Sequence, residues 1–98
     1  MTRLLSIHES AEAEINEASD FYDLESPGLG MVFIDEVERA IESISRFPES
    51  SPLHLGRIRS KTLLKFPYSL MYSIRPEGIR ILAVAHQKRR PFYWHGRR

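Results

Sequence analysis

Residues 68–86, YSLMYSIRPEGIRILAVAH, decide the fold because two strand-like segments flank a turn signal. From Tyr68 to Arg75 apolar side chains alternate mainly with polar ones, which is the period of a half-buried strand. Pro76-Glu77-Gly78 favours a turn, and Ile79 to His86 is apolar on both sides in its middle, as in a central strand. An even number of turn residues keeps residues of the same face opposite each other. We therefore predict an antiparallel hairpin with three facing pairs: Ile74 with Ile79, Tyr72 with Ile81, and Leu70 with Ala83.

The two faces of this hairpin differ in polarity. The register places the large apolar side chains on one face and gathers polar side chains on the other: Ser69, Ser73, Arg75, Arg80 and His86. An apolar sheet face needs a second layer over it. The only large apolar stripes available lie in the N-terminal half, so we expect helices from that half to cover the first face.

The chain before the hairpin predicts a strand and a helix. Arg3 to His8 alternates as a short strand does, and Ser10 suits a helix N-cap because its hydroxyl can accept from a free amide of the first turn. Helical spacing gives one apolar face: Ala11, Ile15, Ala18 and Tyr22. The acids of this helix fall mostly off that face and are expected to face solvent: Glu12, Glu14, Glu17 and Asp20.

A second helix follows the turn signal Ser26-Pro27-Gly28. Its apolar stripe is wider, and Phe47-Pro48 ends it: Phe33, Val37, Ala40, Ile41 and Ile44. Glu49 to Gly56 is expected to be a loop, and Arg57 to Phe66 an extended segment. The prediction is one compact α+β domain over residues 1–98, with the order β-α-α-β-β-β and an N-terminal helical hairpin on a small antiparallel sheet.

Charge is divided unequally between the halves of the chain. The 98 residues carry a net charge of only +1, but residues 1–50 hold 12 acidic and 3 basic side chains. Residues 51–98 hold 11 basic side chains and the single acid Glu77. Some of these charges will pair within one fold. The remaining excess predicts a basic surface suited to an anionic partner.

Several classes of protein are excluded by composition. The longest apolar run, Ile81 to Ala85, is far shorter than the about 20 residues that cross a bilayer. The chain has no cysteine, which excludes a disulfide framework and a thiolate metal site, and its four histidines are scattered. Phosphate-binding glycine motifs are absent. We expect a cytoplasmic protein without a metal, a cofactor or a membrane partner.

The C-terminal stretch HQKRRPFYWHGRR, residues 86–98, interleaves cations with aromatic rings. Cations hold phosphates and aromatic rings stack on bases. Cleavage of RNA without a metal needs a base, a cation and an acid, and His86, Arg89 and Tyr93 are residue types that fill these roles. Alternatively, Phe92, Tyr93 and Trp94 pack a terminal strand onto the sheet and the cations are solvated.

Six motifs together resemble the RelE/ParE superfamily of bacterial toxins from type II toxin–antitoxin pairs. They are, in chain order: Asp20-Phe21-Tyr22, Ser26-Pro27-Gly28-Leu29-Gly30, Ile44 through Phe47-Pro48, Phe66-Pro67-Tyr68 followed by Met71-Tyr72, Ile81 to His86, and the ending from Arg89 to Trp94. The resemblance covers nearly the whole chain and implies the same helical hairpin on a small sheet. It also implies a co-encoded antitoxin that wraps and neutralises the toxin, possible toxin–antitoxin hetero-oligomers, and roles in plasmid stabilization and growth arrest.

The superfamily divides on its target. RelE-like members cut mRNA in the ribosome, and the counterparts of their residues here would be His86, Arg89 and Tyr93 with Arg57, Arg59 and Lys61. The Phe66-Pro67-Tyr68 motif and the ending from His86 to Trp94 are more similar to ParE-type proteins, which bind and poison DNA gyrase without catalytic residues. The ParE-like reading is favoured, with a metal-independent mRNA endoribonuclease or a non-toxic RNA-binding domain as alternatives.

In the favoured reading no residue is catalytic, and a basic, aromatic surface binds the target or the antitoxin. The predicted members of that surface are Arg57, Arg59, Lys61, Arg75, Arg80, Lys88, Arg89, Arg90, Tyr93 and Trp94.

Overall fold

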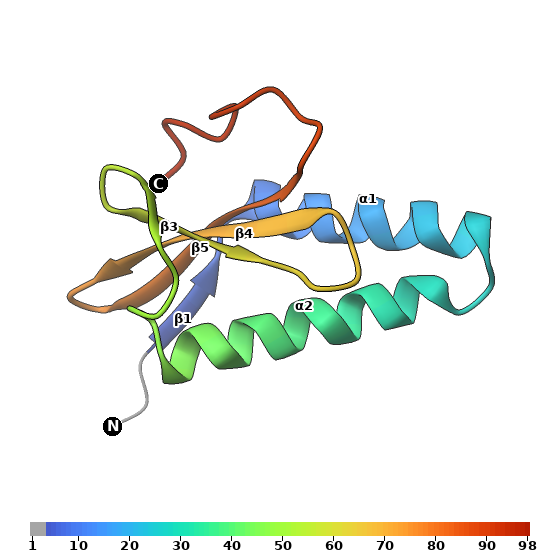
Figure 1. Cartoon of the computed structure of the whole chain (residues 1–98), viewed down its shortest axis with the longest axis horizontal. Coiled ribbons are helices and arrows are strands. Elements are labelled where there is room, and N and C mark those ends of the chain that lie inside the picture. The colour runs from blue at the N-terminus through green and yellow to red at the C-terminus, as the bar shows by residue number, and fades with distance from the viewer. Residues whose placement is uncertain (1–3) are drawn as a thin grey trace.

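The computed structural model describes residues 4–98 and contains two helices and a five-stranded sheet (Figure 1). The elements in chain order are β1 (Leu4–Ile7), α1 (Glu9–Glu25), α2 (Leu29–Arg46), β2 (Leu53–Leu55), β3 (Ile58–Thr62), β4 (Tyr68–Arg75) and β5 (Gly78–His86). The predicted α+β class, with a helical hairpin packed on a small sheet, is confirmed. Arg3, the first residue of the predicted N-terminal strand, lies outside the described residues.

The sheet has the order β1-β5-β4-β3-β2 and is mixed rather than wholly antiparallel, because β1 runs parallel to β5. Local turn signals specify antiparallel neighbours only, whereas the direction of this long-range pair depends on how the helices return the chain. β2 lies inside the segment expected to be a loop. β2 pairs with β3 in antiparallel orientation. The segment before β2 is held by the Arg59 side chain, whose Nη1 donates to the carbonyl oxygens of Glu49 and Ser51 at 3.2 and 2.7 Å.

The first helix, α1, begins at Glu9, one residue before Ser10, the predicted N-cap. His8, not Ser10, is the N-cap: its Nδ1 accepts the Ser10 amide at 3.0 Å, and its carbonyl accepts the Glu12 amide at 3.0 Å. The predicted turn between the helices is confirmed, with Gly28 at φ 88°. Gly30 then lets the helices meet, because a Cβ there would lie 2.5 Å from the Ser19 carbonyl oxygen.

The main core lies between the helices and one face of the sheet. Both predicted helical stripes enter it, with Ala11 and Phe33 fully buried and Ile44 1% exposed. On the strands, Tyr72 is fully buried and its hydroxyl donates to the Pro48 carbonyl oxygen at 2.7 Å. This bond ties the end of the helical hairpin to the centre of the sheet.

The predicted hairpin register is right near the turn and wrong beyond it. Ile74 faces Ile79 and Tyr72 faces Ile81, with an even turn between the strands. Leu82 is an extra residue in β5, so Met71 faces Ala83, and Leu70 faces Val84 instead of Ala83. A bulge of one residue reverses the face of everything after it.

The bulge moves His86 to the opposite face from the one predicted. His86 pairs with Tyr68, and their rings lie 4.9 Å apart on the side of the sheet that faces the helices. Ser73 and Arg80, which precede the bulge, still face each other on the second face.

The second face of the sheet carries its own small core. Trp94 is 2% exposed and packs with Met71, Ala83 and Ala85. The C-terminal segment, defined here as residues 87–98, therefore lies over this face, on the other side of the sheet from α2 (Figure 1). Trp94 is structural, so its assignment to an exposed binding surface is wrong. No helix within residues 4–98 is long and apolar enough to cross a membrane.

Candidate functional site

One carboxylate, Glu14 of α1, holds the C-terminal segment in place. Its oxygens accept the Tyr93 hydroxyl at 2.6 Å and both Arg97 terminal nitrogens at 3.0 and 3.2 Å. It also accepts the main-chain amide of Val84 at 3.0 Å, while Arg97 Nη1 donates to the Leu82 carbonyl oxygen at 3.1 Å. Only 12% of the Glu14 side chain and 19% of the Arg97 side chain are exposed. These contacts join α1, β5 and the C-terminal segment.

The need for these partners follows from the lengths of the strands. β1 has four residues and pairs with β5 only as far as Ile81, whereas β5 continues to His86. Beyond Ile81, side chains replace β1 as the hydrogen-bond partners of β5. Glu14 accepts from the Val84 amide, and Arg97 donates to the Leu82 carbonyl oxygen. Buried main-chain groups need such partners.

Sequence reasoning missed both of these residues. Glu14 was expected to face solvent with the other acids of its helix, and Arg97 was not assigned a role. A weak signal exists in the helical spacing. Glu14 lies three residues after Ala11 and four before Ala18, and both are buried, so it borders the apolar face.

A hollow of about 190 Å³ brings together three predicted residues, His86, Arg89 and Tyr93. Each of them has a partner within the protein. His86 Nδ1 accepts the Lys88 amide at 3.0 Å, the Arg89 guanidinium lies 3.9 Å from the centre of the Tyr93 ring, and the Tyr93 hydroxyl donates to Glu14. The hollow is therefore built mainly by contacts that fold the C-terminal segment.

Tyr93 is held in its protonated form. Burial raises the pKa of its hydroxyl well above the ordinary value, and the hydrogen bond to the Glu14 carboxylate and the negative charge of that group raise it further. The positive charges of Arg89 and Arg97 oppose this effect only in part. Near neutral pH the hydroxyl proton stays on Tyr93 and is shared with Glu14.

The other cations of the alternative nuclease set do not join this hollow. Arg57 and Arg59 line a different hollow at the β2 end of the sheet, and Lys61 lines a third beside α2. Arg59 also donates to the carbonyl oxygens of Glu49 and Ser51, in the segment before β2. The structure therefore separates the two groups of residues that the nuclease reading requires to act together.

The basic half of the chain is left largely without carboxylate partners. Among residues 4–98, two ion pairs form, Arg46 with Glu42 and Arg97 with Glu14, and only the second uses a cation of the C-terminal half. Three consecutive cations directly after β5 are exposed and are called the basic turn: Lys88, Arg89 and Arg90. Arg57 is exposed as well, while Arg75 and Arg80 are half-buried on the second face. None of these cations forms an ion pair among residues 4–98.

Comparisons with known proteins found a matching family model and a solved structure with a similar fold. Residues 5–91 match the family model described as "ParE toxin of type II toxin-antitoxin system, parDE". A solved structure titled "Chromosomal ParDE TA system from P. aeruginosa" contains a chain that superposes with a TM-score of 0.70 at 17% identity, covering 87% of this chain and 96% of the other. No curated protein sequence matches. The family match spans most of the chain and confirms the predicted resemblance: this chain belongs to the ParE toxin family of type II toxin–antitoxin systems.

Proposed function

We propose that this protein is a toxin that acts by binding, that it inhibits DNA gyrase through the basic turn and neighbouring exposed cations, and that a co-encoded antitoxin neutralises it in the cytoplasm. The observation that carries the proposal is the contrast within the C-terminal segment. Tyr93 is committed to internal contacts that fold the segment, whereas the side chains of Lys88 and Arg90 are exposed and form no ion pair among the described residues.

The state of the catalytic candidates supports binding over chemistry. A general acid or base must be free to exchange a proton with its substrate. Tyr93 instead shares its proton with Glu14, and its raised pKa disfavours the anion. The strand cations that would stabilise a reacting phosphate lie in other hollows. Inhibition of a target by binding needs none of these functions.

The antitoxin partner is supported by family membership and by charge. The matched family model describes toxins of parDE systems, and the solved relative is titled a ParDE system. An antitoxin with an acidic segment would complement the unpaired cations of this chain. Such a pair would form a toxin–antitoxin hetero-oligomer in which the toxin surface is covered.

The test has a cellular and a purified arm. Brief induction in bacteria, with pulse-labelling of DNA and protein synthesis in one culture, is expected to stop DNA synthesis first. The purified protein is expected to inhibit gyrase supercoiling, and a triple variant of the basic turn (Lys88→Gln, Arg89→Gln, Arg90→Gln) to lose most of that inhibition. Arg39→Gln on α2, also an exposed cation, is the matched control and should inhibit like the wild type.

The remaining outcomes contradict the proposal in distinguishable ways. Protein synthesis that stops first, with cleaved mRNA on ribosomes and loss of activity in His86→Gln, would establish the endoribonuclease alternative. Continued growth together with salt-sensitive RNA binding would establish a non-toxic RNA-binding domain.

A further inference from the structure

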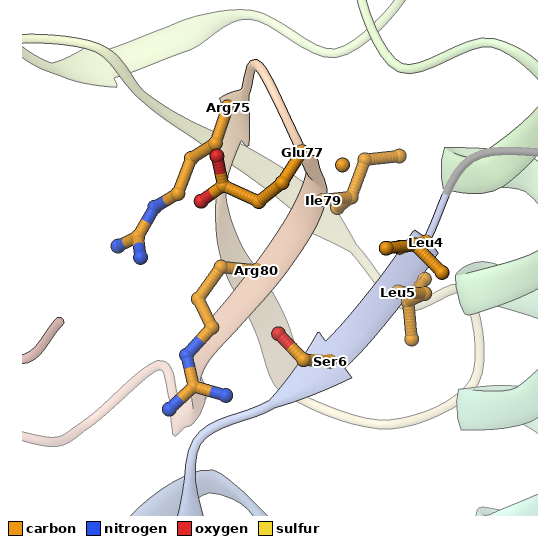
Figure 2. Close-up of a pocket in the computed structure, with 8 residues that line it drawn as sticks. Leu4, Leu5, Ser6, Arg75, Glu77, Ile79 and Arg80 are labelled. Carbon is orange, nitrogen blue, oxygen red and sulfur yellow. The ribbon is translucent and has the colours of Figure 1, made fainter.

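A hollow of about 320 Å³ lies beside β1 and the β4–β5 turn, remote from the basic turn, and two arginines border it. Figure 2 shows Arg75 of β4 and Arg80 of β5 extending toward the same side, with the Ser6 hydroxyl directed toward Arg80. The sheet register explains this grouping. Ser6 is the parallel partner of Arg80, and Arg75 faces Gly78, two residues before Arg80 on the same face.

Neither arginine forms an ion pair with an Asp or Glu side chain among residues 4–98. Arg75 Nε donates to the buried Ser73 hydroxyl at 3.1 Å, which directs the guanidinium and leaves its terminal nitrogens without a bond. Arg80 makes two long contacts, at 3.4 and 3.3 Å, with the Arg98 carbonyl oxygen. Glu77 borders the same hollow, but none of its oxygens lies within ion-pair distance of either arginine.

Arg75 and Arg80 line the same hollow and are both half-buried, so their guanidinium groups are partly desolvated. This arrangement is complementary to an anion that accepts from both groups. The contacts of Arg80 with a carbonyl oxygen already place one acceptor oxygen at this site. The hollow is therefore lined by positively charged groups that donate hydrogen bonds to oxygen.

We propose that the Arg75–Arg80 site binds carboxylate side chains of an acidic segment in a partner protein. The rest of the lining favours a peptide over a nucleic acid. Leu4, which is 72% exposed, contributes apolar surface suited to aliphatic side-chain atoms, and the rim carboxylate of Glu77 opposes a polyanion. β1 is also an edge strand of the sheet, so an extended segment can approach its main chain.

The inference rests on the proposed function only in taking the antitoxin as the source of the acidic segment. Its test is a binding measurement that involves neither gyrase nor growth. The probe is a synthetic peptide, acetyl-Glu-Leu-Glu-Leu-Glu-amide, titrated by calorimetry against the full 98-residue chain at low salt. A peptide with Gln in place of Glu and an oligothymidylate of similar charge serve as comparison ligands.

Arg75→Gln and Arg80→Gln are each expected to weaken binding of the acidic peptide about tenfold or more, because each removes charge-assisted hydrogen bonds. Arg39→Gln removes an exposed cation of α2, outside the predicted binding surface, and is expected to change affinity less than twofold. Arg75→Lys and Arg80→Lys should fall between, since lysine keeps the charge without the forked donors. Nε–Hε signals of Arg75 and Arg80 in the wild-type protein should shift on titration, which needs no variant to fold.

Three results would overturn the proposal. One is an acidic peptide that binds no better than its Gln counterpart. Another is equal loss of affinity in Arg39→Gln, which would mean that only net charge matters. The third is tighter binding of oligothymidylate with the same dependence on Arg75 and Arg80, which would assign the site to nucleic acid. Whether or not the protein inhibits gyrase, the meaning of each of these three binding results stays the same.

Discussion

Replacing Glu14 by alanine removes one acceptor group that serves α1, β5 and the C-terminal segment at once. Tyr93 and Arg97 would lose their partner inside the protein, and the Val84 amide would lose its acceptor. Removing one member of a buried ion pair costs about 3 to 5 kcal/mol. Because 12% of Glu14 and 19% of Arg97 are exposed, we expect the lower end, about 3 kcal/mol.

For a domain of this size, about 3 kcal/mol corresponds to a fall in Tm of about 12 to 24 °C. The assay is urea and thermal unfolding followed by circular dichroism, with fluorescence measured in parallel. Trp94 is the single tryptophan and is 2% exposed, so its emission reports whether the C-terminal segment stays on the sheet. A red shift in Glu14→Ala below the unfolding transition would show that the segment has detached.

Glu17→Ala is the matched control, since Glu17 is an exposed glutamate of the same helix, and its stability should stay within about 0.5 kcal/mol of wild type. A double-mutant cycle with Arg97→Ala should give a coupling energy of about 1 to 3 kcal/mol. The reasoning is refuted if Glu14→Ala behaves like Glu17→Ala in both stability and Trp94 emission.

Three further substitutions test separate parts of the structure. In Gly78→Ala the new Cβ would overlap the Leu4 carbonyl oxygen, so β1 should detach from β5, with a loss of more than about 2 kcal/mol and faster hydrogen exchange in β1; an unchanged urea midpoint would contradict this. Tyr72→Phe loses the bond to the Pro48 carbonyl and should cost about 1 kcal/mol in urea unfolding, and no cost would mean that water replaces the bond. Tyr93 has a raised pKa, so above pH about 10 the unfolded chain loses a proton that the native chain keeps, and stability falls as pH rises. Tyr93→Phe should show a shallower decline between about pH 9 and 11, while Tyr22 and Tyr68, whose pKa burial also raises, contribute equally to both proteins; equal slopes would show that Tyr93 is not shifted.

Much of the candidate site could be predicted by residue type but not by role. His86, Arg89 and Tyr93 do meet in one hollow. The carboxylate that holds Tyr93 comes from elsewhere in the chain, however: Glu14 is 79 residues before Tyr93. No local pattern announces a contact over that separation. The same limit explains why Trp94, in a strongly basic stretch, was assigned to a surface although it is buried on the second face of the sheet.

The sequence by itself determined the elements other than β2, and it indicated the family. Helical spacing from Ala11 to Tyr22 and from Phe33 to Ile44, the Gly28 turn, and strand alternation around Tyr72 all follow from contacts within a few residues. Only the tertiary structure decided the parallel pairing of β1 with β5, the bulge at Leu82, and the partners of Glu14. The physical reason is that these features satisfy main-chain and charged groups between distant segments. Their free energy depends on which groups folding brings together, and periodicity carries no information about that.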